Sequence, residues 1–225
     1  MVIPAFNAAR FLADAIDSAL SQDVAILELL VVDDGSTDAT AQIAASYGDR
    51  VVLLRQPNRG PSAARNLGIA YARGEFLAFL DSDDTWPAHH LATLLAAMTP
   101  LTDIVLGQIQ ELMFDDAQRQ WVPSRAPTFS PSLCAMLTRH RTMQRVGPLD
   151  ETIRIGEDKD WFYRAQEAGQ IIEYLPRHIA LHHRRHDGNI TRQMGRPETY
   201  LLALLRKSLH RRGLLTADAT TPEAS

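Results

Sequence analysis

The sequence predicts an α/β fold in which a mostly parallel sheet is flanked by helices. Short, continuous apolar runs alternate with stretches of helical periodicity through about the first hundred residues. Such alternation is typical of right-handed βαβ units and a parallel sheet. Turn and helix-capping residues follow the apolar runs, at the positions where strands would end. The chain has 225 residues, of which 45% are apolar, and this is enough to bury a core.

The strands expected in the first half are short and apolar throughout, as strands buried on both faces are. They lie at residues 2–3, 27–32, 51–54 and 76–80. Between them, apolar residues recur on one helical face, and Gly48 and Gly74 stand where two of the helices would end. The expected helices cover residues 9–21, 38–48, 62–72 and 86–98.

From about residue 99 the pattern loosens and predicts a smaller second half. Strands are expected at 103–106, 171–175 and 179–183, and helices at 157–168 and 197–212, while residues 107–132 show no clear period. We therefore expect a single domain over residues 1–213, with halves at 1–98 and 99–213. The small, polar residues 214–225 are expected to form a disordered tail.

Charge and cysteine content narrow the function classes. The net charge of −4 gives no basic excess, which argues against nucleic acid as a partner. The single cysteine, Cys134, stands in an apolar stretch, so we expect a buried thiol. A chain without a disulfide framework fits a reducing compartment, and we expect a cytoplasmic protein. No apolar run approaches the ~20 residues that span a bilayer.

An acidic run, Asp81-Ser82-Asp83-Asp84, directly follows the apolar residues 76–80. Three carboxylates this close repel one another unless a cation lies between them. Oxygen ligands suit Mg²⁺ or Mn²⁺, which are commonly held by one or two carboxylates together with substrate phosphates. Such an ion would neutralise a diphosphate leaving group. The alternative is a solvated turn that caps the next helix.

A second acidic turn, Asp33-Asp34-Gly35-Ser36, follows the apolar residues 27–32. Ligands of parallel sheets bind beyond the carboxyl ends of the strands, so both acidic turns are expected at one edge of the sheet. One aspartate here could accept a hydrogen bond from a ligand N–H group, such as the imide of uracil. The alternative is a turn whose Asp and Ser residues only cap a helix.

Two further charged positions stand near expected helix starts. Arg65 follows Gly60-Pro61, and an arginine there could reach a diphosphate or hold an aspartate, or form only a surface ion pair. Glu157 and Asp158 begin the helix expected at 157–168, where a carboxylate could act as a general base or as a helix cap.

A basic cluster ends the last expected strand. It comprises His182, His183, Arg184, Arg185 and His186. A histidine of this cluster could complete a metal site, or the arginines could hold phosphates. The alternative is a solvated, basic edge strand. The histidine spacing and the lack of cysteine partners do not favour zinc.

Seven segments in this order resemble the family 2 glycosyltransferases, which have a GT-A fold with a Rossmann-like sheet. In the first half they are VIPAFN at 2–7, VVDDGSTD at 31–38, NRGPSAARNLG at 58–68 and FLDSDD at 79–84. In the second half they are GPLDE at 147–151, GEDKDW at 156–161 and RRHDGNIT at 184–191. The resemblance covers residues 2–191 and implies a nucleotide-sugar-binding first half and an acceptor-side second half.

The resemblance also implies a role for individual residues. The catalytic base would be Asp158, with Glu157 as the second choice. The nucleotide-sugar would contact Pro4, Phe6, Asn7, Asp33, Asp34, Arg65, Asp81 and Ser82. A Mn²⁺ or Mg²⁺ ion would be held by the aspartates of the DxD motif, with a further contact from a histidine. These metal ligands are Asp81, Asp83, Asp84 and His186, and Asp83 is our first choice for direct ligation.

The implied reaction inverts the anomeric centre as a sugar passes from a nucleotide-sugar, UDP-linked by preference, to an acceptor hydroxyl. The acceptor would be a glycan, a lipid-linked molecule or another hydroxyl compound in bacterial surface-glycan or glycoconjugate assembly. Its contacts are expected within 107–145. A catalytically inactive nucleotide-sugar-binding protein is an alternative. A sugar nucleotidyltransferase is disfavoured, because Pro4-Ala5-Phe6-Asn7 replaces a Gly-rich, basic loop.

The helix expected at 197–212 is both basic and amphipathic. Such a helix either packs on the catalytic core, which we favour, or lies on an anionic membrane at its inner face. The sequence leaves open this peripheral membrane contact and the formation of a homodimer.

Overall fold

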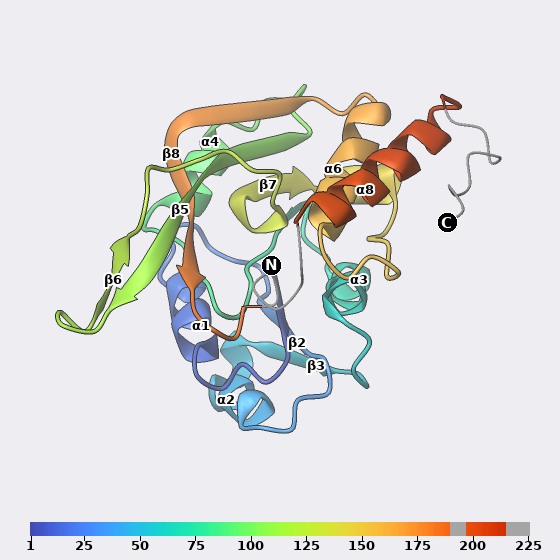
Figure 1. Ribbon diagram of the computed structural model, residues 1–225. Coiled ribbons are helices and arrows are strands. Elements are labelled where there is room, and N and C mark those ends of the chain that lie inside the picture. The colour runs from blue at the N-terminus through green and yellow to red at the C-terminus, as the bar shows by residue number, and fades with distance from the viewer. Residues whose placement is uncertain (190–196, 215–225) are drawn as a thin grey trace, which may run out of the picture.

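The computed structural model describes residues 1–189 and 197–214 and has two sheets flanked by helices (Figure 1). The first sheet is parallel, with the strand order β1-β2-β3. Its strands are β1 (Val2–Ala5), β2 (Leu30–Asp33) and β3 (Val52–Arg55). The helices of this half are α1 (Leu12–Leu20), α2 (Thr40–Ser46) and α3 (Pro61–Tyr71).

Every residue of β1 and β2 is buried, as expected for parallel strands covered on both faces. Helix α3 lies very close to β1, because Gly68 presents no side chain to it. A Cβ atom at Gly68 would stand 2.4 Å from Cγ1 of Val2. This close approach fixes α3, and with it the side chains at the start of the helix.

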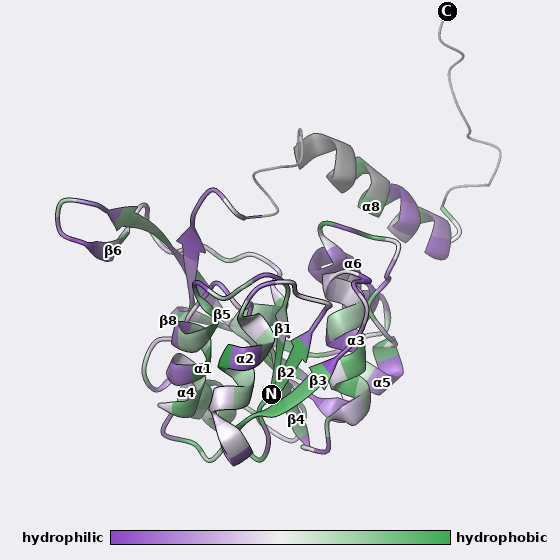
Figure 2. Ribbon diagram, turned by 90° about the horizontal axis from the view of Figure 1, so that it is seen from below, coloured by the Kyte–Doolittle hydropathy of each residue, from purple (hydrophilic) through white to green (hydrophobic). Residues whose placement is uncertain are grey.

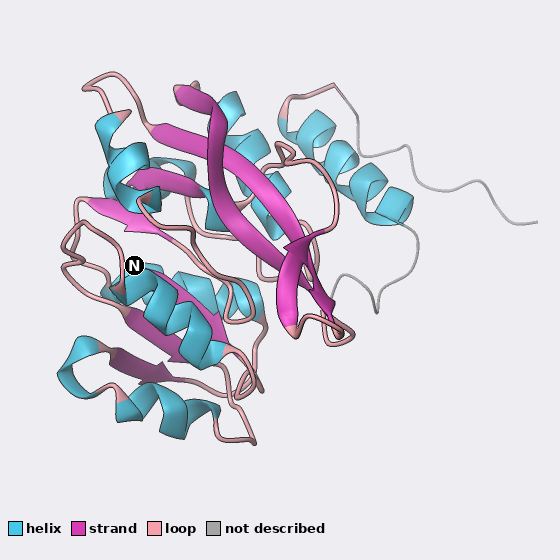
Figure 3. Cartoon of the chain, turned by 90° about the vertical axis from the view of Figure 1, so that its left-hand side faces the viewer, coloured by secondary structure: helices cyan, strands magenta, loops and turns pink. Residues whose placement is uncertain are grey.

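The second sheet is mixed and contains β4 (Phe76–Ala78), β5 (Ile104–Asp115), β6 (Gln120–Pro123), β7 (Met136–Arg139) and β8 (Ile172–Arg185). Its order is β4-β7-β5-β6 with antiparallel neighbours, and β8 pairs with β5 in parallel. The long strands β5 and β8 run side by side (Figure 3). The helices of this half are α4 (His90–Ala96), α5 (His140–Val146), α6 (Glu157–Glu167) and α8 (Pro197–Arg211).

A short parallel contact joins the two sheets. Phe79, just beyond β4, pairs with Val2 of β1, and the amide of Leu80 donates to the carbonyl of Val2. One continuous cluster of buried side chains includes Ile3 and Val31 from the first half and Leu106 and Trp161 from the second. The two halves therefore share a core, and the expected boundary at residues 98–99 falls between α4 and β5.

The predicted α/β fold with a parallel sheet flanked by helices is confirmed, but several boundaries differ. The helix expected from residue 86 begins only at His90, because Trp86 is held outside the helix. Its indole N–H donates to the carbonyl of Cys134, and its amide donates to Oγ of Ser18. The predicted burial of Cys134 is confirmed, with 2% of the residue exposed.

The largest differences lie in the second half. The strand expected at 103–106 continues to Asp115 and forms a hairpin with β6, and this hairpin projects from the body of the molecule (Figure 2). Its outer part is largely exposed, which explains why residues 107–132 show no simple apolar period. The two short strands expected at 171–183 form the single strand β8, and helix α5 was not predicted.

Helix α8 packs against α6, as the favoured interpretation of residues 197–212 predicts. Leu204 and Ser208 are buried, and Lys207 and Arg211 form ion pairs with Asp150 and Asp160 at 2.7 and 2.9 Å. Leu202 and Leu205 remain exposed, and membrane contact stays a prediction. Within residues 1–189 and 197–214, no helix is long and apolar enough to cross a bilayer. The tail expected at 214–225 lies outside the described residues except for Leu214.

Candidate functional site

The carboxyl ends of β1, β2 and the segment that follows β4 meet at one edge of the first sheet. The parallel register pairs Ala5 with Asp33, and the pairing of Val2 with Phe79 brings the acidic run 81–84 beside β1. Helix α3 adds its first turns from the loop that follows β3, and α6 approaches from the second half. The sheet edge predicted to hold both acidic turns therefore does hold them.

The turn at Asp33 and Asp34 is tightly braced by its own carboxylates. Asp33 is fully buried and accepts hydrogen bonds from the amide of Ser36 and from Nε of Arg55, both at 3.0 Å. Asp34 accepts from the amides of Arg59 and Gly60 at 2.9 and 2.8 Å. The contacts of Asp33 thus stabilise the turn, and a contact of this residue with a nucleotide-sugar stays a prediction.

Both carboxylate oxygens of Asp34 already accept hydrogen bonds from the protein itself. The side-chain amide of Gln56 donates to Oδ1 at 2.7 Å, so both carboxylate oxygens hold the loop 56–60 against the turn. Gly35 makes this approach feasible, because its φ is +78° and a Cβ atom there would stand 2.8 Å from the amide nitrogen of Asn58. A bond from Asp34 to a ligand base remains a prediction.

The residues expected to line a base pocket differ in exposure. Pro4 is buried within β1, whereas Phe6 is 49% exposed just beyond the strand. Asn7 adopts a φ of 48° and accepts a hydrogen bond from the amide of Thr37 at 2.9 Å. Asn7 thereby ties the end of β1 to the second acidic turn, and the ring of Phe6 is left accessible beside it.

Arg65 connects the acidic run to the start of α6. Its guanidinium is buried and forms ion pairs with Asp81 at 2.5 Å and with Glu157 at 2.7 Å. Burial alone would lower its pKa, but the two carboxylates raise the pKa of Arg65, so the side chain stays charged. The alternative of a surface ion pair is excluded, because only 7% of the Arg65 side chain is exposed.

Asp158 stands beside Glu157 in the first turn of α6 and is half-buried. Burial and the negative charge of Glu157 raise the pKa of Asp158 to about 7. The amide of Lys159 donates to its Oδ1 at 2.7 Å, which fixes one carboxylate oxygen. A carboxyl group with a pKa near neutrality is suited to accept a proton at physiological pH.

Asp83 and His186 lie against each other, at the acidic run and at the end of β8. Oδ2 of Asp83 and Nε2 of His186 are 3.0 Å apart, and Asn189 donates to the same Oδ2 at 3.1 Å. Burial opposes ionisation, but the hydrogen bond to His186 lowers the pKa of Asp83. Of the predicted metal ligands, these two are brought together.

Asp84 has a different environment from Asp83. It is 1% exposed and accepts hydrogen bonds from the amide of Arg184 at 2.8 Å and from His183 at 3.1 Å. Burial raises the pKa of Asp84 to about 6, while the carboxylate raises the pKa of His183 to about 9 against the effect of burial. These bonds hold β8 against the acidic run, so metal ligation by Asp84 stays a prediction that its contacts do not favour.

Asp83 and His186 fit a divalent ion whose coordination shell is completed by substrate oxygens. Oδ2 of Asp83 and Nε2 of His186 are 3.0 Å apart, so both atoms could face one bound ion. Asp81 and Asp83 are also the exposed members of the run, at 38% and 29% of their side chains. Among the described residues, no group of three or more His, Cys, Asp or Glu side chains could hold an ion. Phosphate oxygens and water would have to complete the shell.

Several residues around this site were not predicted from the sequence. Asn189 bonds to both Asp83 and His186, and the Phe11 ring lies 4.5 Å from the His186 ring. Trp121 of β6 stacks on the Arg184 guanidinium at 5.2 Å. Asn189 lies within the matched segment 184–191 and could have been identified there. Trp121 could not, because its approach depends on the hairpin geometry.

Comparisons with known sequences give a consistent result. The sequence model described as Glycosyl transferase family 2 matches residues 1–164. The succinoglycan biosynthesis protein ExoO of Rhizobium meliloti is 32% identical, over 85% of this chain and 62% of its own length. An uncharacterised glycosyltransferase of Rickettsia typhi is 26% identical, over 85% of this chain and 65% of its own. The chain therefore spans less than two thirds of these relatives.

Solved structures share the fold. The Staphylococcus aureus protein TarS, residues 1–349 in complex with UDP-GlcNAc, superposes with a TM-score of 0.76 at 21% identity, over 97% of this chain and 67% of its own. The mannosyltransferase PcManGT of Pyrobaculum calidifontis, in complex with GDP-Man and Mn²⁺, has a TM-score of 0.72 at 18% identity, over 98% and 64%. The predicted GT-A fold class is confirmed by these likenesses.

Proposed function

Because the chain belongs to glycosyl transferase family 2, we propose that it moves a sugar from a nucleotide-sugar to an acceptor hydroxyl with inversion. The observation that carries this proposal is the pair of salt bridges by which the buried Arg65 joins Asp81 to Glu157. It couples the acidic run at the sheet edge to the helix that presents Asp158. A donor site and a general base are thereby held at a fixed separation.

The donor we propose is linked to UDP. Phe6 offers an exposed ring beside the braced turn at Asp33 and Asp34, and a flat ring is a suitable surface for a pyrimidine. TarS, whose fold this chain shares, binds UDP-GlcNAc, which supports the choice of nucleotide. PcManGT binds GDP-Man, so guanine is the competing base that an experiment must include.

The proposed reaction assigns one task to each charged group. The Asp158 carboxylate takes the proton of the acceptor hydroxyl, whose oxygen attacks the anomeric carbon opposite the departing nucleoside diphosphate. Arg65 keeps Asp81 and Glu157 in place, and its positive charge offsets part of the rise that burial and Glu157 cause in the pKa of Asp158. Asp83 and His186 would hold a divalent ion, which when bound neutralises the charge of the leaving diphosphate.

The wider role we propose is glycan or glycoconjugate assembly in the cytoplasm. ExoO, a relative at 32% identity, is described as a succinoglycan biosynthesis protein, which supports a role in making surface glycans. The buried, unpaired Cys134 is consistent with a reducing compartment.

Calorimetric titration with UDP, GDP and CDP, each with and without Mn²⁺, tests the donor site. We expect UDP to bind most tightly and to lose most of its affinity when Mn²⁺ is withheld, because the ion would neutralise the diphosphate beside the Asp83 carboxylate. An Asp83→Asn variant should bind UDP as the wild type does without the ion. Equal UDP affinity with and without Mn²⁺ would contradict the proposed metal, and no binding of any nucleotide would contradict the function.

A further inference from the structure

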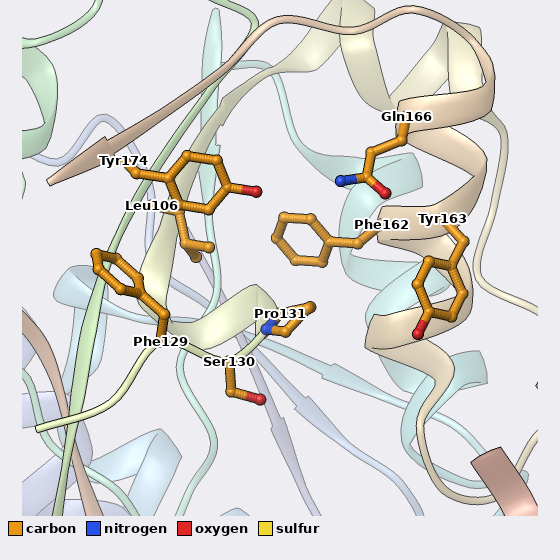
Figure 4. A pocket seen from close by; sticks show the side chains of 8 residues that line it. All are labelled: Leu106, Phe129, Ser130, Pro131, Phe162, Tyr163, Gln166 and Tyr174. Carbon is orange, nitrogen blue, oxygen red and sulfur yellow. The ribbon is translucent and has the colours of Figure 1, made fainter. Parts of the chain in front are cut away.

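A small aromatic cavity lies between α6 and the second sheet and opens to solvent at its rim, where Phe129 and Tyr174 are partly exposed (Figure 4). Its volume is about 130 Å³, and its walls come from β5, β8, α6 and the segment before β7. The lining residues are Leu106, Phe129, Ser130, Pro131, Phe162, Tyr163, Gln166 and Tyr174. Phe162 of α6 and Tyr174 of β8 point toward one another across it (Figure 4). No residue assigned to donor binding lines this cavity.

The cavity and the proposed base share one face of α6. Phe162 and Gln166 follow Asp158 by four and eight residues, and residues at this spacing lie along one stripe of a helix. At 1.5 Å per residue, they stand about 6 and 12 Å along the axis from Asp158. If the first ring of an extended molecule presents a hydroxyl to Asp158, the next ring of that molecule would therefore reach the cavity.

The lining favours a neutral ring that has apolar faces and polar edges. Phe129, Phe162 and Tyr174 supply aromatic surface, while Ser130 and Gln166 supply a hydroxyl and an amide. Among the described residues, none that lines the cavity is charged, which does not favour a phosphate or a carboxylate. An alkyl chain would leave the polar groups without partners when buried, which costs free energy.

The volume corresponds to about one six-membered ring, since a protein cavity of ~150 Å³ holds one benzene molecule. The wall is also preformed. Thr128 and Ile109 exchange two backbone hydrogen bonds of 2.8 and 3.0 Å, which fix the segment carrying Phe129. The rings of Phe129 and Tyr174 meet edge to face at 5.7 Å. A rigid site of this kind loses little freedom when it binds a ring.

We propose that this cavity binds the second sugar ring of a neutral glycan acceptor, whose first ring presents the attacking hydroxyl to Asp158. The proposal rests on the proposed function, because it takes Asp158 as the point at which the acceptor reacts. It identifies the acceptor as a chain of at least two sugar rings rather than a free monosaccharide or a phosphorylated lipid. The ring in the cavity sets acceptor specificity and does not react.

Saturation-transfer NMR tests this binding without knowledge of the donor sugar. The probes are cellobiose, maltose, lactose and N,N′-diacetylchitobiose, each compared with its component monosaccharides and with octyl glucoside. The variants are Phe129→Ala and Tyr174→Ala, two residues that are 40% and 46% exposed. Tyr71→Ala is the matched control, since Tyr71 is 58% exposed on α3, outside the cavity. Thermal unfolding of each variant confirms that it is folded.

We expect at least one disaccharide to receive more saturation than its monosaccharides, and to lose about tenfold in affinity in both cavity variants, since aromatic contacts have this magnitude. The Tyr71→Ala protein should bind it as the wild type does. The proposal is overturned if no disaccharide binds, or if binding is unchanged in the cavity variants. Saturation confined to the octyl chain of octyl glucoside, and lost in the same variants, would also overturn it and assign the cavity to an apolar chain.

Titration of the same samples with UDP and Mn²⁺ separates this inference from the proposed function. Nucleotide binding that persists while every saccharide fails contradicts the acceptor cavity alone. If the wild-type protein binds no nucleotide, the proposed function itself is contradicted.

Discussion

Replacing Asp158 with asparagine is expected to stabilise the folded protein above neutral pH. Burial and the charge of Glu157 raise the pKa of Asp158 from 3.8 to about 7, so the fold favours the protonated carboxyl. A group whose pKa is raised by folding stabilises the protein below its unfolded pKa and loses this contribution as pH rises through the folded pKa. The free energy of unfolding therefore falls as the pH rises from about 4 to about 7, and the full penalty for the Asp158 charge is present above pH 7.

The full difference between the two pKa values corresponds to roughly 4 kcal/mol. Asp158 is only half-buried, and solvent screening reduces the expected gain to about 1–3 kcal/mol. Asparagine preserves the local structure, because its Oδ1 can accept the same hydrogen bond from the amide of Lys159. The substitution thus removes a charge with little change in shape.

Urea unfolding of the wild type and Asp158→Asn at about pH 8 and about pH 5 measures this effect. We expect the variant to be more stable at the higher pH, and the difference to shrink at the lower one. Asp49→Asn is the control, because Asp49 is exposed in the turn Gly48–Arg50, and it should show no such dependence. Equal stability of wild type and Asp158→Asn at both pH values would refute the account of this carboxyl.

Other substitutions test separate parts of the structure. Glu157→Gln removes a negative charge that raises the pKa of the neighbouring base, so the rise of the pH–rate profile should move to lower pH; an unchanged profile would show that this charge has no influence. Gly68→Ala should destabilise the protein by about 1–3 kcal/mol in chemical denaturation, as overpacking does, because the added Cβ would overlap Val2. Adding Val2→Ala to this variant should restore part of the lost stability. A Gly68→Ala protein as stable as the wild type would contradict the close packing. Asp84→Asn should lower the pKa of His183 by more than Asp83→Asn does, because the Asp84 carboxylate contacts His183 and raises its pKa to about 9 against the effect of burial. An NMR titration in which the pKa of His183 is unchanged in Asp84→Asn would contradict this contact.

Local patterns were sufficient to predict most elements of the first half of the fold, although the strand expected at 76–80 belongs to the second sheet and the one expected at 27–32 begins at Leu30. Strands such as Leu30–Asp33 are apolar at every buried position except the last, and the turn that follows carries its own signals. The second half depends on long-range pairing. The outer part of β5 pairs with β6 and β8 away from the core, so its residues need not alternate, and its extent could not be read from periodicity.

The same distinction holds for the site. Topology predicts that Asp33 and Asp81 reach one sheet edge, because the sequence places each after a strand of a parallel sheet. In the structure Asp81 follows β4 of the second sheet, and the parallel contact of Phe79 with Val2 brings it to that edge. The different environments of Asp83 and Asp84 could not be predicted, since they depend on which of the two faces the end of β8. The ion pair of Arg65 with Asp81 is one of the alternatives that the sequence offers for this arginine. The pair with Glu157 joins residues 92 positions apart, and neither charge pattern alone indicates it.

A single comparison of donor binding with turnover tests the central claim most directly. Wild type and Asp158→Asn are titrated with UDP in the presence of Mn²⁺, and both are assayed for UDP release from a panel of UDP-sugars with a glycan acceptor. We predict unchanged UDP affinity in the variant and a loss of acceptor-dependent turnover of at least about a hundredfold, the contribution of a general base. Near-normal turnover by Asp158→Asn, with UDP still bound, would contradict the assignment of Asp158 as the base.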